Sequence, residues 1–417
     1  MVQSRAGDPS CQSFNPIGWR RAWRGAMASL TAAMIAAALL GPGAPARAWE
    51  GKGMGEGMGE GDEPEAVLPV VASTIPSPPA PQDVNPYGVE FVPSGFPKGG
   101  LLSPGDLLVS NFNDSDNFQG TGRTIVKFSP DGQQSLFFQG NPGLGLTTAL
   151  EVLKKGFVLV GNFPAPASGP NAGSCNASSP GSILIIDSSG NQVGSIEAAD
   201  LHGLLNGPWD STIDDNGSKV TLFVSSALTG SVLRFELAVS GSGVAISSGP
   251  TVVADGYTFG CDPLTFVQAP TGLVFDKKRD RLFVASTDDN AVFAVENASK
   301  RTSSGGTGVA VFTDAVHLHG ALAMVQGPFG HLFVSNNDNV NLPVTVTSAI
   351  TEFSVDGCKT VQPNCATFIR QFSIDPAPGG AFGLNFDQRG DDTRFAFVDD
   401  NVPNVTIWNI AGEGRKH

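Results

Sequence analysis

Six copies of one short apolar segment recur along the chain. Each copy ends in small or polar residues, and the copies start 50 to 64 residues apart, at 107–111, 158–162, 222–226, 282–286, 332–336 and 395–399. Each has the length and composition of a β-strand. A unit repeated at this spacing is typical of a β-propeller or a solenoid.

A second apolar strand with small residues near its start precedes each copy, at 86–91, 148–152, 208–213, 270–275, 318–322 and 382–386. Small residues suit the innermost strand of a blade, where backbones crowd together. Third and fourth strands follow in most units, for example 124–128 and 135–138, which the turn Ser129–Gly132 joins. Six units of four antiparallel strands predict an all-β fold, the six-bladed β-propeller.

The last unit supplies only three strands, because 405–410 is third in order and only a short tail, 412–417, follows. An apolar run at 67–72 lies between Gly-rich and Pro-rich tracts that cannot form a core. We expect this run to be the missing outer strand, which would close the ring and protect its edges. The expected organisation is therefore a leader, 1–48, a linker with the closing strand, 49–85, and the propeller, 86–411.

The first 48 residues have the features of a cleaved signal peptide. Arginines at 20, 21 and 24 precede an apolar run, 26–40, and Ala46-Arg47-Ala48 is an A-x-A cleavage site. The apolar run is shorter than a membrane-spanning helix requires, so we expect no membrane span after cleavage. The protein is predicted to be secreted or periplasmic, and the Arg20-Arg21 pair leaves the Sec and twin-arginine export routes both open.

Composition and charge narrow the functional classes. The chain has 52 Gly, 30 Pro and only 15% charged residues, which suits short strands joined by tight turns. Cleavage would remove five of 25 basic and one of 39 acidic residues, leaving a net charge of −18. Such a surface repels nucleic acid and anionic membranes.

Four cysteines remain after cleavage, an even number that favours disulfides in an oxidising compartment. Cys358 and Cys365 are close enough in sequence for a local bridge, and Cys175 would then pair with Cys261. No C-x-x-C pair is present, which argues against a zinc ribbon or a thioredoxin-like site.

The run 270–276, followed by 281–292 (RLFVASTDDNAV), resembles the NHL-type repeat. Propellers with similar repeats include gluconolactonases of the SMP-30 type, paraoxonase-like lactonases and streptogramin lyases. The resemblance implies the architecture and leaves function open, since such propellers include both enzymes and interaction modules. For a lactonase it implies a divalent metal on the axis held by Glu, Asn and Asp, with Glu90 as the nearest match to the first-blade glutamate. The histidine of the lyases has no matching context here.

In a four-stranded blade, the loop before the first strand and the loop after the second open on the same side of the disc, which we call the loop face. The expected ligand-contacting residues on this face are Tyr87, Asn111, Asn162, Trp209, Asn336 and Asp399. Their Asn and Asp oxygens suit calcium or magnesium, and Glu90, Asp210, Asn336 and Asp399 are the candidate metal ligands. Asn and Asp are also common turn residues whose side chains bond nearby backbone, so a structural role is the alternative at each position.

Candidate catalytic residues are Glu90, Asp210 and His319. His317 and His319 lie on the same side of a predicted strand, a spacing that could share a metal, although a hydrogen-bonded structural role is the alternative. No serine-hydrolase elbow, phosphate-binding loop or H-E-x-x-H helix is present in a plausible context.

These observations favour an exported, monomeric propeller that binds a small ligand or a protein on its loop face, without evident catalytic residues. The alternative is a calcium-dependent lactonase or hydrolase with its site on the axis.

Overall fold

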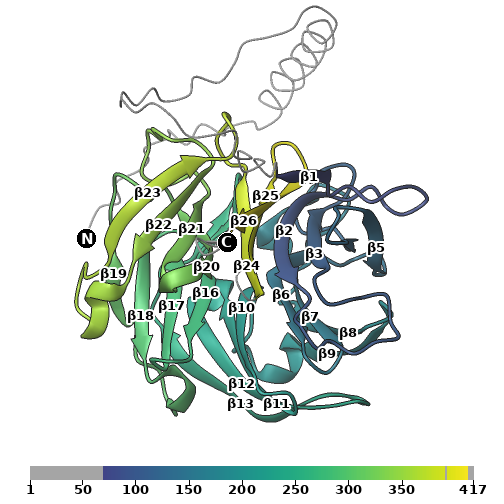
Figure 1. Ribbon diagram of the computed structural model, residues 1–417, viewed down its shortest axis with the longest axis horizontal. Helices are drawn as coiled ribbons and strands as arrows, with labels where there is room; N and C mark the ends of the chain where they lie inside the picture. The colour runs from purple at the N-terminus through teal and green to yellow at the C-terminus, as the bar shows by residue number, and fades with distance from the viewer. Residues whose placement is uncertain (1–68, 390–391, 412–417) are drawn as a thin grey trace, which may run out of the picture. The chain divides into compact units, whose positions relative to one another are not determined.

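The computed structural model describes residues 69–389 and 392–411, which form six four-stranded antiparallel sheets and one two-stranded sheet. The predicted signal peptide, most of the predicted linker and the tail lie outside the described residues. Figure 1 shows the six sheets as blades around a centre, with the inner strands β2, β6, β10, β16, β20 and β24 facing it. The all-β, six-bladed propeller predicted from the repeats is therefore confirmed.

The first three blades follow one another in chain order. Their strands are β2 (Val84–Phe91), β3 (Leu107–Asn113), β4 (Thr124–Phe128) and β5 (Gln134–Gln139); β6 (Leu146–Leu153), β7 (Phe157–Asn162), β8 (Ser182–Asp187) and β9 (Gln192–Glu197); β10 (Pro208–Asp215), β11 (Lys219–Ser226), β12 (Ser231–Ser240) and β13 (Gly243–Asp255). A small hairpin, β14 (Gly260–Asp262) and β15 (Phe266–Gln268), precedes the fourth blade.

The remaining blades are built in the same order, and the sixth takes its outer strand from the start of the described chain. Their strands are β16 (Pro270–Asp276), β17 (Arg281–Ser286), β18 (Ala291–Glu296) and β19 (Val309–Phe312); β20 (Ala321–Gln326), β21 (Leu332–Asn336), β22 (Ala349–Ser354) and β23 (Thr367–Ser373); β24 (Ala381–Arg389), β25 (Asp392–Asp399), β26 (Asn404–Ala411) and β1 (Val70–Ser73). Short 3-10 turns occur at η1 (Cys175–Ala177), η2 (Ala198–Leu201), η3 (Ala227–Thr229), η4 (Ala298–Lys300), η5 (Pro328–Gly330) and η6 (Asp356–Lys359).

Strand β1 closes the ring as predicted, by pairing antiparallel to β26 with Val70 opposite Ile407 and Ser73 opposite Asn404. It begins at Val70 rather than at the predicted residue 67. The inner strand of the fifth blade also differs from the prediction of 318–322, because Gly320 has a φ of +87° and ends the extended conformation there. His319 therefore lies in the loop before β20.

The apolar core lies between neighbouring blades, because successive residues of a strand point to opposite faces of its sheet. In β3, Leu108 packs toward the second blade, whereas Leu107 and Val109 pack toward the sixth. The same division recurs at every blade junction, giving six buried clusters between blades and a seventh, aromatic cluster near the axis.

Every inner strand carries an irregularity in its first half. The register between first and second strands shifts after Pro86, Leu146, Pro208, Pro270, Ala321 and Ala381. A β-bulge bends the strand and redirects side chains. Tyr87, Trp209, Asp210 and Phe382 all lie in these irregular segments, which places them near the axis.

Candidate functional site

Aromatic side chains close the axis at the loop face. Tyr87 stacks on Phe112 and on Phe382, with ring centroids 4.5 Å and 4.4 Å apart, and Trp209 packs edge-on against Tyr87 at 5.6 Å. Phe266 packs against Phe112 at 5.1 Å. We call these five residues the aromatic cluster. Tyr87 and Trp209, two of the expected ligand contacts, are thus buried in a core.

The Cys175–Cys261 disulfide binds two loops over this cluster. Its Cα atoms are 5.5 Å apart, and the buried Cys175 packs with the aromatic residues. Phe266, which enters the cluster, lies five residues after Cys261. The second disulfide, Cys358–Cys365, joins residues that are 7 apart in sequence on the fifth blade. Two disulfides fit an oxidising compartment.

Below the aromatic cluster, the inner strands surround a chamber of about 240 Å³, which we call the axial chamber. Its carboxylates are Glu90 on β2, Glu151 on β6 and Asp210 on β10. Glu151 and Asp210 are only 7% and 8% exposed, whereas Glu90 and the lower wall at Gln326 are half-buried. Since exposure increases away from the aromatic cluster, the chamber opens on the side opposite the loop face.

Each of the three carboxyl groups in the axial chamber accepts a hydrogen bond from a residue of a neighbouring blade. Ser211 Oγ donates to Glu151 Oε1 at 3.2 Å, the Leu273 N–H donates to Asp210 Oδ2 at 2.9 Å, and the Asn385 amide donates to Glu90. Among the described residues that line the chamber, none is a Lys, Arg or His.

Burial without a cationic partner shifts the titration of these groups. Burial, with the nearby Asp210, raises the pKa of Glu151 to about 8, and burial raises the pKa of Asp210 to about 7. Burial, with the nearby Glu151, raises the pKa of Glu90 well above its usual value. These shifts favour the protonated form of the chamber carboxyls more than water does.

The axial residues do not form a recognisable metal site. Within residues 69–389 and 392–411, no three or more His, Cys, Asp or Glu side chains are grouped so that they could hold a metal ion. Of the four candidate ligands, Glu90 and Asp210 line the axial chamber, but Asn336 and Asp399 do not. The four candidate ligands therefore do not all line one chamber.

The polar side chains at the ends of the second strands form hydrogen bonds with backbone groups. Asn162 Oδ1 accepts the Gly145 N–H at 2.9 Å, and Asn336 Oδ1 accepts the His319 N–H at 3.1 Å. Asn111 donates to the Thr74 carbonyl at 3.0 Å. In each case the buried amide binds a neighbouring loop or strand, which is the turn role that competes with ligand contact. Asp399 Oδ1 likewise accepts the Asn401 N–H at 3.0 Å.

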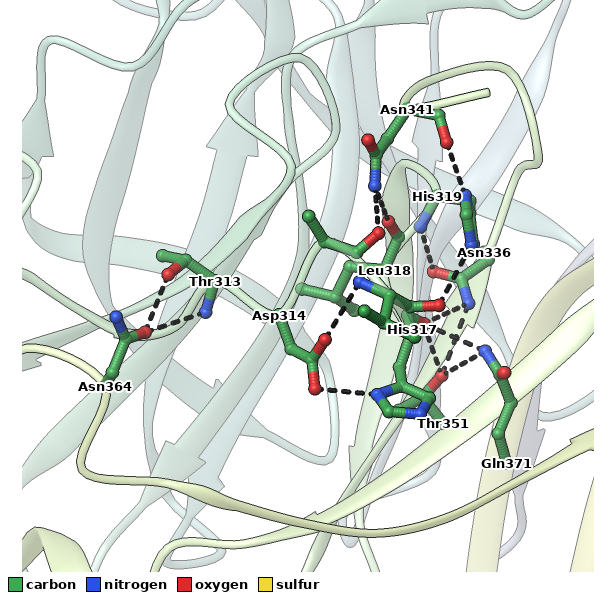
Figure 2. Close-up of polar contacts among 12 residues, drawn as sticks. Thr313, Asp314, His317, Leu318, His319, Asn336, Asn341, Thr351, Asn364 and Gln371 are labelled. Atoms are coloured by element: carbon green, nitrogen blue, oxygen red, sulfur yellow. Dashed lines mark hydrogen bonds and ion pairs between the residues drawn. The ribbon is translucent and has the colours of Figure 1, made fainter. Parts of the chain in front are cut away.

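His317 and His319 point to different partners, as Figure 2 shows. His317 Nδ1 lies 2.6 Å from Asp314 Oδ2. His319 is buried, and its Nδ1 and Nε2 lie 2.8 Å and 3.3 Å from the carbonyl oxygens of Asn341 and Val316. The two imidazoles do not share a site, and His319 links the loop before β20 to the loop after β21.

A second cavity, of about 230 Å³, lies on the loop face beside the aromatic cluster, and we call it the loop-face pocket. Its lining comes from loops and the starts of inner strands in blades one, four, five and six: Asn85, Tyr87, Gln119, Leu264, Thr265, Asn337, Asp338, Asn339, Pro378, Gly379, Phe382 and Asp400. Tyr87 lines both cavities, so this residue lies between them.

Three residues of the pocket lining each have one polar side-chain atom without a hydrogen-bond partner in the described part of the chain: Asn337 Nδ2, Asp338 Oδ1 and Gln119 Oε1. Each of these atoms has less than 1 Å² of accessible surface, so it is packed behind the pocket wall. The Asn337 and Asp338 side chains are only 5% and 6% exposed. Their other polar atoms are bonded, since Asn337 Oδ1 accepts the Asn339 N–H at 3.0 Å and Asp338 Oδ2 accepts the Ser348 N–H at 2.5 Å. A buried polar atom without a partner is costly to the folded state.

A second carboxyl group borders the pocket. With its amide nitrogen facing Asp400, Asn85 donates to the two carboxyl oxygens at 2.8 Å and 3.3 Å. Burial, with the nearby Asp399, raises the pKa of Asp400 to about 7. Burial also raises the pKa of Asp338.

Sequence reasoning missed Gln119, Asp338 and Glu151. Gln119 lies in a loop without a motif, so only the fold brings it to the pocket. Asp338 lies two residues after the predicted ligand contact Asn336, in a polar run. Glu151 had a detectable pattern, because Leu150-Glu151-Val152 repeats the apolar–Glu–apolar pattern of Val89-Glu90-Phe91 on the preceding inner strand.

No protein-family model matches this sequence, and no curated protein is similar to it in sequence. Solved structures of similar fold include a proposed oxidoreductase (glucose dehydrogenase) from Thermus thermophilus, with 12% identity, coverage of 82% of this chain and 100% of the other, and a TM-score of 0.47. A gluconolactonase from Xanthomonas campestris has 12% identity, coverage of 82% and 90%, and a TM-score of 0.45. The calcium-binding protein regucalcin from Agrobacterium tumefaciens has 10% identity, coverage of 82% and 95%, and a TM-score of 0.42.

These similarities concern the propeller fold, which the strand pairing of this chain establishes by itself. In the described part of the chain, no helix is long and apolar enough to span a membrane.

Proposed function

We propose that this propeller is an exported binding protein that holds a small polar ligand in its loop-face pocket. The observation that supports it is the pocket itself, a cavity of about 230 Å³ whose lining combines polar residues such as Asn85, Gln119 and Asn339 with the aromatic Phe382. A concave site with a few polar groups on an otherwise rigid wall is typical of small-molecule binding.

The surroundings of the pocket also favour binding. The aromatic cluster supports one wall, and the Cys175–Cys261 disulfide restrains the loop that carries Leu264 and Thr265. Rigid walls reduce the entropy that binding must overcome. The binding function needs no catalytic group, in keeping with a pocket lined by amides and carboxyls.

The experiment is a ligand-observed NMR screen of water-soluble fragments against the wild type and Asn339→Trp. Asn339 lines the pocket and makes only a 3.5 Å side-chain bond to Asp262, so the indole can fill the cavity at little other cost. Leu342→Trp is the matched control, because Leu342 is exposed on the same loop outside the lining. Fragments should bind the wild type and the control but not Asn339→Trp. Equal binding to all three proteins would place the ligand elsewhere.

A hydrolase acting on a lactone or ester in the axial chamber is a second candidate. The observation that favours it is the pair Glu151 and Asp210, whose raised pKa values would leave a carboxyl able to donate a proton to a leaving group near neutral pH. This candidate uses the carboxyls alone.

The test of this candidate is hydrolysis of δ-gluconolactone and γ-butyrolactone, with and without added calcium. An axial hydrolase should lose roughly 100-fold or more of its activity in Glu151→Gln, which retains the size and the Ser211 contact of the side chain. Absence of hydrolysis by the wild type under both conditions would exclude these substrates. A calcium-dependent thermal shift that disappears in Glu90→Gln would restore the metal hypothesis.

A further inference from the structure

We propose that the loops of blades four to six on the loop face dock a Lys- and Arg-rich segment of another protein that carries apolar side chains between its charges. This interaction goes beyond the small-ligand binding proposed above and does not depend on it. Three features support it: the one-sided charge of the propeller, exposed apolar side chains on the acidic side, and hydrogen bonds that join the loops concerned.

The two faces of the propeller differ in charge. Within the described residues, the connections that open on the loop face contain eleven Asp, no Glu, one Arg and no Lys. The described connections of the opposite face contain nine Lys or Arg and four Asp. A face with one sign of charge attracts a partner of the opposite sign and speeds its association. The loop face therefore selects a cationic partner.

The loops that lead into or lie within blades four to six contain no Lys or Arg. We call these loops the acidic rim: residues 256–269, 287–290, 313–320, 337–348, 374–380 and 400–403. They hold seven of the eleven Asp. Among the ion pairs of the described chain, only the one between His317 and Asp314 lies in the rim. Burial, with the nearby Asp289 and Asp262, raises the pKa of Asp288, as expected for carboxylates without a cationic partner.

Hydrogen bonds join the loops of the acidic rim into one surface. Their order is 256–269 to 287–290 and to 337–348, 337–348 to 313–320 and to 374–380, and 374–380 to 400–403. One of these bonds, from the Asn341 amide to the Leu318 carbonyl at 3.1 Å, is visible in Figure 2. A connected surface of this kind loses little conformational entropy when a partner binds.

Apolar side chains of the acidic rim are exposed to solvent. Four are more than half exposed and a fifth nearly so: Leu264, Val316, Leu342, Val402 and Phe259. The described connections of the opposite face carry two large exposed apolar side chains, Leu101 and Phe329. Exposed apolar groups that lie together mark an interaction surface. Because they lie among carboxylates, the matching partner has both basic and apolar side chains.

A basic protein segment fits the acidic rim better than other occupants do. Nucleic acids and anionic membranes are repelled by the carboxylates. A small cation would leave the apolar side chains exposed. A second copy of the chain would have to offer its opposite face, where the basic side chains at 277, 279 and 300 are already paired with Asp carboxylates of the same chain.

Fluorescence anisotropy with a labelled peptide that repeats Lys-Lys-Leu four times tests the inference. The peptide should bind the wild type at about 0.05 M salt and more weakly at about 0.5 M salt, because salt screens exposed charges. A Lys-Lys-Ser peptide of the same length should bind about tenfold more weakly, since it lacks the apolar side chains. A Glu-Glu-Leu peptide should not bind.

Substitutions in the acidic rim locate the contact. Asp288→Lys reverses an exposed charge, and Val316→Ser combined with Leu342→Ser removes two exposed apolar groups. Each variant should weaken binding of the Lys-Lys-Leu peptide by about tenfold. The matched controls lie on the opposite face, where Asp356→Lys reverses an exposed charge and Leu101→Ser removes an exposed apolar group. The controls should bind like the wild type, and equal melting temperatures would show that all variants keep the fold.

The outcomes separate the acidic rim from the loop-face pocket. Asp288, Val316 and Leu342 do not line that pocket, so the fragment screen with Asn339→Trp still judges the small-ligand function. Equal binding of the Lys-Lys-Ser peptide, no binding of the Lys-Lys-Leu peptide, or weaker binding by the controls than by the rim variants would each overturn the proposed docking. Oligomers of the wild type that Asp288→Lys abolishes would also overturn it, since they would assign the rim to a second copy of the chain.

Discussion

The position of an acidic residue on an inner strand decides how easily its carboxyl group ionises. Glu90 and Glu151 occupy equivalent positions on adjacent inner strands, opposite Leu108 and Leu159. Both therefore point into the same narrow chamber, together with Asp210 from the third blade. Three carboxyls in one chamber repel each other when ionised, and burial adds to the cost.

Glu151→Gln should change how stability depends on pH. The pKa of Glu151 is raised from about 4.5 to about 8 by folding, so the folded state holds a proton that the unfolded state has lost between these values. Wild-type stability should fall as pH rises from about 5 to 8, by at most about 1.4 kcal/mol per pH unit from this residue, and then level off.

The stability of Glu151→Gln should lack this part of the decrease with pH. Relative to the wild type, the variant should therefore be more stable at pH 8 than at pH 5. Urea unfolding between pH 5 and 9 measures the effect, with the exposed Glu197→Gln as control. Parallel curves for wild type and Glu151→Gln would show that Glu151 titrates normally.

At the scale of elements, the loops rather than the strands distinguish one blade from another. The residue that ends each second strand pairs with the start of the first strand in every blade, and at Asn162 and Asn336 it also binds the loop before that strand. The Cys175–Cys261 disulfide adds a covalent link between loops of the second and fourth blades. The loop face is thus fixed, which suits a preformed pocket.

Replacing Cys175 and Cys261 together by Ser should lower the free energy of unfolding by about 4 kcal/mol, because this bridge joins residues 86 apart in sequence. The matched Cys358→Ser and Cys365→Ser pair should cost less, since its bridge spans only 7 residues. Chemical unfolding without reductant compares the two. The reverse order would mean that the long bridge strains the folded loops.

At the scale of the whole molecule, stability depends on closing the ring. Strand β1 covers the outer edge of β26, and its Val70 and Ala72 pack with the core between blades six and one. Without β1, the hydrogen-bonding groups of β26 would form an exposed edge, which promotes pairing with other chains.

A chain that begins at Asp83 should therefore unfold at lower temperature than one that begins at Ala66 and should form oligomers. The Ala66 chain retains β1 and should remain monomeric. Calorimetry and size-exclusion chromatography with light scattering make the comparison. Identical melting and elution of the two chains would show that the ring is stable without its closing strand.

The sequence by itself determined the propeller, the six blades and the closing strand, because strand periodicity and repeat spacing are local properties of the chain. It also grouped Tyr87, Trp209 and the strand-end polar residues on one face, since blade topology fixes that side. Only the tertiary structure decided that Tyr87 and Trp209 form a buried cluster and that Asn162 and Asn336 bind backbone. It also brought Gln119 and Asp338, 219 positions apart in the printed sequence, to the lining of one pocket. Which polar atoms stay unpaired in a pocket depends on the packing of distant loops, and no local pattern encodes that.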